Sequence, residues 1–80
     1  ATLLYEQNKG RITGVFSGND ADGLYQYALG SSQADMKALS KAMNDRLAGR
    51  GGGSTMMAQG TLKGTREEIR LVFLEEAGKL

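Results

Sequence analysis

Residues 24–48 read LYQYALGSSQADMKALSKAMNDRLA, and the period of their apolar side chains changes partway along. Up to residue 29 the side chains alternate as in a strand, which places Tyr25, Tyr27 and Leu29 on one face. From about Ala34 to Ala48 the apolar residues recur at helical spacing instead. The stripe of this helix consists of Met36, Leu39, Met43 and Leu47. A strand that leads into such a helix predicts a sheet with the helix packed on it.

The residues that flank this helix predict its ends. Asp35 or Ser32 is expected to be the N-cap, because a side-chain oxygen there can accept from the free N–H groups of the first turn. Gly49 is expected to end the helix in the left-handed conformation, which glycine adopts without steric cost.

Two more strands are predicted before residue 24. Residues 3–5 are apolar, and residues 11–17 are rich in β-branched and aromatic side chains. The turn signal Asn8-Lys9-Gly10 between them predicts a β-hairpin. Residues 18–23 have the composition of a second turn.

The chain after residue 49 predicts one short strand and a second helix. The strand lies within residues 54–62, around Met56-Met57-Ala58-Gln59. Thr65 and Glu68 form the Thr-x-x-Glu pattern of a capping box, which opens a helix from about Arg66 to Ala77. Its apolar face consists of Ile69, Val72, Phe73 and Ala77, widened by Leu71 and Leu74, and Gly78 is expected to end it. The predicted fold is α/β, with one small mixed sheet of three to five strands covered by two helices in the order β-β-β-α-(β)-α.

Length and composition exclude several kinds of site. A chain of 80 residues is expected to form one small domain, residues 1–80. It has no Cys and no His. A disulfide, a thiolate zinc site and a Ser-His-Asp device therefore cannot be built from it, and we predict no catalytic residue, metal site or cofactor here.

The chain also lacks the patterns of membrane or secreted proteins. No apolar run approaches the roughly 20 residues that span a bilayer. The N-terminal residues do not have the pattern of a signal peptide. We therefore expect a cytoplasmic protein with no membrane partner. Because the chain begins at Ala1, we expect it to be part of a larger protein.

Residues 47–60, LAGRGGGSTMMAQG, are the unusual segment. Three adjacent glycines cost backbone entropy, so stability does not explain Gly51, Gly52 and Gly53. Glycines let a ligand approach the backbone and direct successive N–H groups at an anion. Arg50 adds a guanidinium suited to phosphate, and Ser54 adds a hydroxyl donor. The segment is typical of a cradle for a phosphodiester or an RNA 3′ end; the alternative is a flexible connection. The strings of a P-loop and of a dinucleotide fingerprint are both absent.

Four basic residues between positions 46 and 66 have no acid among them: Arg46, Arg50, Lys63 and Arg66. We expect Arg46, Lys63 and Arg66 to support the phosphate contact, and Arg66 also lies in a helix's first turn, where free N–H groups favour an anion. In the alternative interpretation Arg46 and Arg66 only balance nearby acids. Gln59 is expected to bond a base or ribose, or else to satisfy a strand edge.

Other conspicuous side chains are interpreted as structural. Tyr25 and Tyr27 could stack on bases from an exposed sheet face, but a core position is favoured. The methionines are expected to pack in the core or at an interface; they are Met36, Met43, Met56 and Met57. The helical acids are expected to form a solvated face and to suit the helix dipole; they are Glu67, Glu68, Glu75 and Glu76.

Residues 49–53 followed by Met57-Ala58-Gln59-Gly60 resemble the glycine-rich signature of the DHHA1 domain, in its alanyl-tRNA synthetase branch. There a Gly-Gly-Gly run precedes a Met-Ala-Gln strand, between two helices. The resemblance covers Tyr25 to Leu74. Full synthetases often have Arg-Pro-Asp where this chain has Ser54-Thr55-Met56, so it looks closer to the stand-alone editing proteins of the AlaX type.

The resemblance implies the C-terminal part of a protein that hydrolyses tRNA(Ala) mischarged with serine or glycine, or of an alanine-tRNA ligase. Zinc is implied only for a separate editing domain, whose His and Cys ligands this chain lacks. For this domain the resemblance implies binding of tRNA, with homodimerisation as the alternative. A substrate-binding subdomain of a DHH-type phosphoesterase is a further alternative. In that branch a His typically follows the glycines, whereas Ser54 follows them here.

Overall fold

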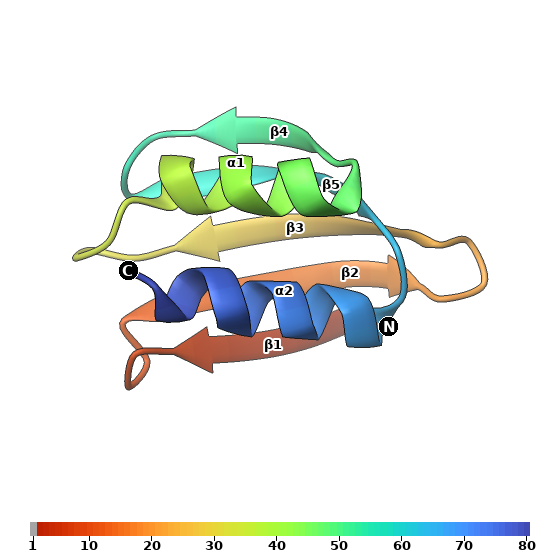
Figure 1. Cartoon of the computed structure of the whole chain (residues 1–80), viewed down its shortest axis with the longest axis horizontal. Coiled ribbons are helices and arrows are strands. Elements are labelled where there is room, and N and C mark those ends of the chain that lie inside the picture. Colours follow the sequence, from red (N-terminus) through yellow and green to blue (C-terminus); the bar gives the residue numbers. More distant parts are fainter. Residues whose placement is uncertain (1) are drawn as a thin grey trace.

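A computed structural model describes residues 2–80, which form a five-stranded sheet covered on one face by two helices (Figure 1). The elements follow the order β1 (Thr2–Gln7), β2 (Ile12–Asn19), β3 (Leu24–Gly30), α1 (Met36–Leu47), β4 (Arg50–Gly53), β5 (Met57–Lys63) and α2 (Arg66–Gly78). The strands lie in the order β1-β2-β3-β5-β4, and every neighbouring pair is antiparallel. Helix α1 packs on β4 and β5, and α2 packs on β1 and β2.

This architecture confirms the predicted α/β class, a small sheet covered by two helices. The optional fourth strand of the sequence is β5. The alternative interpretation of the glycine segment, a flexible connection, is wrong, because Arg50–Gly53 forms strand β4 at the edge of the sheet. Its backbone pairs with β5, and Gly51 lies opposite Gly60, so no side chains separate the two strands there.

Alternation along the strands builds the core. The side chains that face the helices are buried on β2, β3 and β5; they include Ile12, Phe16, Tyr25, Tyr27, Leu29, Ala58 and Leu62. They meet the predicted stripes of both helices, which are buried as expected. Tyr25 and Tyr27 are only 1% and 3% exposed, which confirms their core position and leaves neither ring free to stack on a base. Met56, Met57 and Leu71 are exposed, so a core position is wrong for them. The other expectation for the two methionines, an interface position, stays a prediction.

The helix ends agree with the sequence in three of four cases. Asp35 caps α1 and accepts from the N–H groups of Lys37 and Ala38 at 3.0 and 3.2 Å. The capping box of Thr65 and Glu68 opens α2, and this helix ends at Gly78. The C-terminus of α1 differs, because Ala48 and not Gly49 takes the left-handed conformation, with φ of 48°. Gly49 is needed for another reason: a Cβ there would lie 2.4 Å from the carbonyl oxygen of Thr61.

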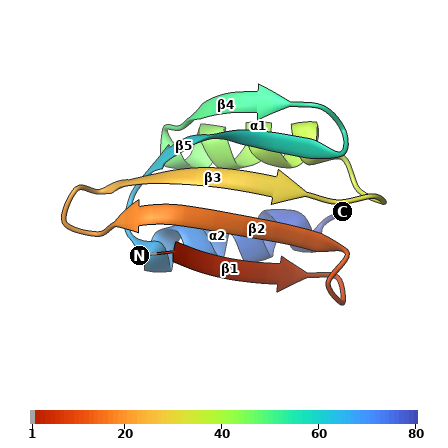
Figure 2. The ribbon, with the colours of Figure 1, turned by 180° about the vertical axis from the view of Figure 1, so that it is seen from behind.

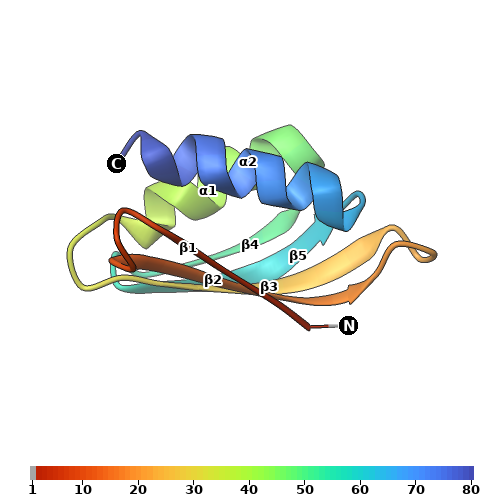
Figure 3. The same cartoon turned by 90° about the horizontal axis from the view of Figure 1, so that it is seen from below.

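The second face of the sheet has no element over it among residues 2–80, as the view from behind shows (Figure 2). Figure 3 shows the same two layers edge-on, with both helices on one side. We call the uncovered side the open face. Its central row runs across the sheet through Leu4, Val15, Ala28, Gln59 and Gly52.

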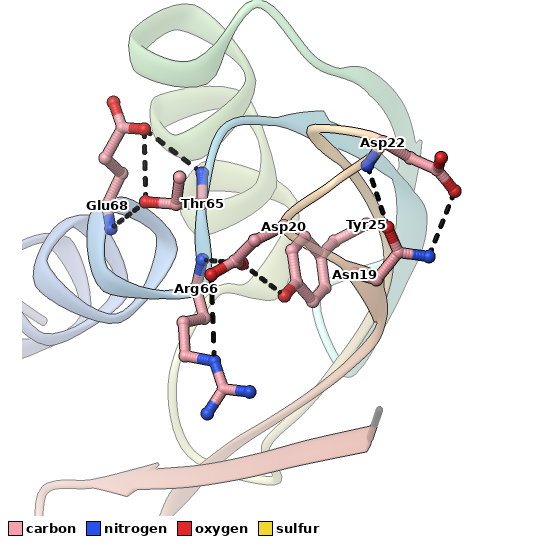
Figure 4. A network of polar contacts seen from close by, with 7 residues as sticks. All are labelled: Asn19, Asp20, Asp22, Tyr25, Thr65, Arg66 and Glu68. Carbon is pink, nitrogen blue, oxygen red and sulfur yellow. Dashed lines mark hydrogen bonds and ion pairs between the residues drawn. The ribbon is translucent and has the colours of Figure 1, made fainter.

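Hydrogen bonds to the Asp20 side chain link the β2–β3 turn to the start of α2 (Figure 4). Its carboxylate accepts from the Tyr25 hydroxyl at 2.7 Å and from the backbone N–H of Arg66 at 2.8 Å. The hydrogen bond from Tyr25 is the main cause that holds the pKa of Asp20 below its ordinary value, and the Arg66 N–H adds to it. The same bond raises the pKa of Tyr25. Residues 46 positions apart are thereby joined through one charged group.

The lowered pKa of Asp20 predicts a specific loss of stability in acid. A carboxylate whose folded pKa is depressed stabilises the fold fully above its unfolded pKa, near the ordinary value of 3.8. That contribution disappears as the pH falls below this value and through the lower folded pKa. We expect Asp20→Asn to be less stable than wild type at pH 7 in urea denaturation, with the difference shrinking below pH 4. A difference that stays constant with pH would contradict this assignment.

Candidate nucleic-acid interface

The structure brings four of the candidate residues together on the open face. Gly52 lies opposite Gln59, and Arg50 lies opposite Thr61. Lys63 follows Thr61 by two residues on β5, so it points to the same side. Arg50, Gly52, Gln59 and Lys63 are all exposed there. Residues from positions 50 to 63 thus converge on one surface because β4 folds back on β5.

The three glycines of β4 have different roles. A Cβ at Gly51 would lie 2.3 Å from the carbonyl oxygen of Gln59, and its φ of 148° disfavours other residues. A Cβ at Gly53 would lie 2.2 Å from the carbonyl oxygen of Met57. A Cβ at Gly52 would meet nothing within 4 Å. Packing therefore explains Gly51 and Gly53 but leaves Gly52, on the open face, without a structural reason.

A buried hydroxyl group holds β4 in place. The Tyr27 hydroxyl lies 2.6 Å from Oγ of Ser40 and donates to Oδ1 of Asn44 at 3.0 Å. Asn44 in turn donates from Nδ2 to the carbonyl oxygen of Gly51 at 3.4 Å. A Cβ at Gly51 would lie 2.8 Å from the same tyrosine hydroxyl. Strand β3 and helix α1 together thus position the glycine strand.

Ser54 has a structural role in the β4–β5 turn. Its Oγ accepts from the N–H groups of Met56 and Met57, each at 3.3 Å. Its own N–H donates to the carbonyl oxygen of Met57 at 2.7 Å. Its hydroxyl donates to the same carbonyl oxygen at 3.4 Å. These bonds close the turn, so the hydroxyl that the sequence suggested as a ligand donor is engaged within the chain.

Arg46 and Arg66 do not join this surface. Arg46 lies on α1 and forms ion pairs with Glu75 and Glu76 of α2 at 3.4 and 3.0 Å. Its hydrogen bond to Glu76 raises the pKa of Arg46 and lowers that of Glu76. At the start of α2, the Asp20 carboxylate already occupies the N–H group of Arg66 and lies 3.9 Å from its Nε. Both arginines therefore pair with acids, as the alternative interpretation of the sequence expected.

The part of the open face formed by β3, β4 and β5 carries cations without acids. Alternation places there Leu24, Gln26, Ala28, Gly30, Arg50, Gly52, Met57, Gln59, Thr61 and Lys63. A hollow of about 80 Å³ lies among them, lined by Ala28, Gly52, Gly53, Met57, Ala58 and Gln59. This surface presents the cations Arg50 and Lys63, the amide of Gln59, the hydroxyl of Thr61 and the bare backbone of Gly52. These groups suit phosphate and ribose oxygens.

Sequence reasoning missed Lys9 and Arg11. They flank Gly10 in the β1–β2 turn, and both are exposed. The turn signal at Asn8-Lys9-Gly10 explained these residues as a connection, and nothing in the sequence linked them to the glycine segment. The structure places them beside Met56 and Met57, at one end of the sheet.

Within the described residues, no three Asp or Glu side chains gather where they could hold a metal ion. No helix of residues 2–80 is long and apolar enough to cross a membrane.

No family model matches this chain, and neither the curated proteins nor the solved structures contain a match to it.

The glycine geometry predicts opposite results for two neighbouring substitutions. Gly52→Ala adds a methyl group in open space and restricts the unfolded chain, so we expect it to be neutral or to stabilise the fold by up to about 1 kcal/mol. Gly53→Ala forces β4 away from β5, and we expect it to cost roughly 1–3 kcal/mol. Urea denaturation followed by circular dichroism measures both. Equal destabilisation by the two variants would show that the distinction between the glycines is wrong.

Proposed function

We propose that this domain is a tRNA-binding accessory module of a protein related to alanyl-tRNA synthetases, of the alanyl-tRNA editing kind. The observation that carries the proposal is the composition of the open face over β3, β4 and β5. Arg50 and Lys63 lie there with Gln59, without an acid among the residues of these strands that face the same way. Gly52 keeps the backbone of the edge strand β4 accessible on this surface, although packing does not require a glycine there.

The proposed contact is made to the RNA backbone, and not to stacked bases. Proteins that read unpaired bases on a sheet stack them on exposed aromatic rings. Here Tyr25 and Tyr27 face the helices and are buried. Amide, hydroxyl and guanidinium groups bond phosphate and ribose without reading sequence. The module therefore adds affinity and orientation, and the identity of the tRNA is read elsewhere in the parent protein.

Catalysis belongs, in this proposal, to a separate domain of the parent protein. The chain lacks both Cys and His, so the zinc ligands of an editing domain have no counterpart in it. The role left to these residues is to bind the tRNA and help present its acceptor end. Because tRNA is the partner, the proposed location is cytoplasmic.

The alternatives draw less support from the molecule. A dimerisation surface needs a contiguous apolar patch, yet Leu71 on α2 is separate from Met56 and Met57 at the start of β5. On the open face Leu4, Val15 and Ala28 form one short apolar row. Leu74 is partly buried against the core. A phosphoesterase subdomain is disfavoured because Ser54 stands where that branch typically has a histidine, and its hydroxyl closes a turn.

The proposal predicts salt-dependent binding that depends on Arg50. We expect the chain to bind tRNA(Ala) at low salt and more weakly at physiological salt, with log affinity falling linearly against log salt concentration. Arg50→Glu should weaken binding and reduce the steepness of that line by about one contact, a slope change of roughly 0.9. Fluorescence anisotropy with labelled tRNA measures both quantities.

Arg70→Glu is the matched control, since Arg70 is an exposed cation on α2, away from the open face. It changes the net charge equally and should alter binding far less. A non-cognate tRNA should bind with similar affinity, because the contact is to the backbone. No binding at low salt, or equal loss in the two variants, would refute the proposed interface.

A further inference from the structure

A second cationic site lies at the other end of the sheet from Lys63. The β1–β2 turn, the connection from β3 to α1 and the β4–β5 turn meet at this end, on the right in Figure 2. They line a shallow, open groove of about 610 Å³. Its lining includes Lys9, Gly10, Arg11, Thr13, Ser31 and Ser32. This lining contains two cations, several hydroxyl groups and no carboxylate.

The two cations of this groove are not neutralised by the chain. Neither Lys9 nor Arg11 forms an ion pair with any of residues 2–80. Two acids lie nearby. The Asp35 carboxylate accepts from the N–H groups of Lys37 and Ala38 and so serves the N-terminus of α1. Glu6 lies on β1 next to Gly10, outside the groove lining. The lining itself therefore carries only the charges of Lys9 and Arg11, while the carboxylates of Asp35 and Glu6 lie at its edge without pairing with them.

The β1–β2 turn presents these cations on a fixed backbone. Asn8, Lys9 and Gly10 all have positive φ, at 57°, 60° and 82°. The Asn8 side chain donates to the carbonyl oxygens of Ala77 and Leu80 at 3.3 and 3.0 Å, which anchors the turn to the end of α2. A left-handed conformation is unfavourable for lysine and easy for glycine. Stability alone would therefore favour glycine at position 9, and a charged residue held there in strain suggests a binding role.

Hydroxyl groups complete the lining. Ser31 Oγ accepts from the N–H groups of Gln33 and Ala34 at 3.1 and 3.0 Å, so its own hydrogen remains available as a donor. Ser32 is exposed beside it. Cations with hydroxyl donors are the groups that bind phosphate oxygens.

We propose that this groove binds a phosphate group of the same RNA that crosses the open face, which makes the interface a two-ended one. This inference rests on the proposed function. β5 connects the two ends and has seven residues, so the groove and Lys63 are separated by about 20 Å at about 3.3 Å per residue. Arg50 and Lys63 at one end and Lys9 and Arg11 at the other therefore contact different phosphates.

The groove can be tested with inorganic pyrophosphate, in a manner independent of tRNA. In a ¹H–¹⁵N NMR titration of the whole chain we expect the amide signals of Gly10, Arg11, Ser31 and Ser32 to shift progressively. The double variant Lys9→Gln/Arg11→Gln should lose these shifts. Lys41→Gln/Arg70→Gln, with the same change of charge on the helical layer, should keep them. Absent shifts, or shifts that persist in the first variant, would overturn the site.

The same variants connect the groove to RNA. Lys9→Gln/Arg11→Gln should weaken tRNA binding roughly tenfold at physiological salt and lower the salt slope by about 2, at about one unit per cation lost. If Arg50→Glu weakens binding and this double variant does not, the two-ended interface is wrong while the proposed function stands. If wild type binds pyrophosphate but no tRNA, the groove is an anion site only. The proposed tRNA contact on the open face and the proposed RNA phosphate in the groove are then both wrong.

Lys9→Gly separates binding from folding. Glycine adopts the left-handed conformation of position 9 without strain, so this variant should fold at least as well as Lys9→Gln. We expect it to reduce the pyrophosphate shifts while the remaining amide signals keep their positions. Shifts as large as those of wild type would remove Lys9 from the site.

Discussion

The hydroxyl group of Tyr27 determines how strand β4 sits against the rest of the molecule. It is buried between β3 and α1, where Ser40 and Asn44 satisfy it, and Asn44 also holds the carbonyl oxygen of Gly51. A buried hydroxyl without partners would be costly, so these bonds specify one arrangement of strand and helix. Position 51 requires a glycine, because a Cβ there would lie 2.8 Å from that hydroxyl. Packing against Tyr27 and Asn44 therefore determines where the glycine strand lies, and this placement leaves Gly52 exposed on the open face.

The division of the sheet into a covered and an open face also limits what the open face can do. A domain of 80 residues has little apolar material for a core. Both tyrosines of β3 and both phenylalanines are used in it, and Phe16 and Phe73 meet edge to face with ring centroids 5.7 Å apart. No aromatic ring of the strands is left on the uncovered side among the described residues. Over β3, β4 and β5 that side offers charge and hydrogen-bonding groups, which suit ligands with many equivalent anionic groups, whereas Leu4 and Val15 make it apolar over β1 and β2.

The sequence predicts most of the elements because their signals are local. Alternation identified β3, helical spacing identified the buried stripe from Met36 to Leu47, and Thr65 with Glu68 marked the start of α2. Strand β4 could not be predicted, because glycine has a low strand propensity. The contact between Gly51 and Gly60, which allows the two backbones to pair, exists only in the folded chain. The candidate site was predicted in part: Arg50, Gln59 and Lys63 converge, whereas Arg46 pairs with acids 29 and 30 residues away. The difference between Gly52 and its neighbours depends on atoms of β5 and has no signal in the sequence.

The bonds between the first turn and the last helix have a consequence for how the chain reaches its fold. Gln7 donates to the carbonyl oxygen of Leu74, and Asn8 donates to that of Ala77, across separations of 67 and 69 residues. Contacts of such long range form late, since the entropy of closing a large loop must be lost first. During synthesis, part of the core side of the N-terminal hairpin therefore stays exposed until helix α2, which packs on β1 and β2, has left the ribosome.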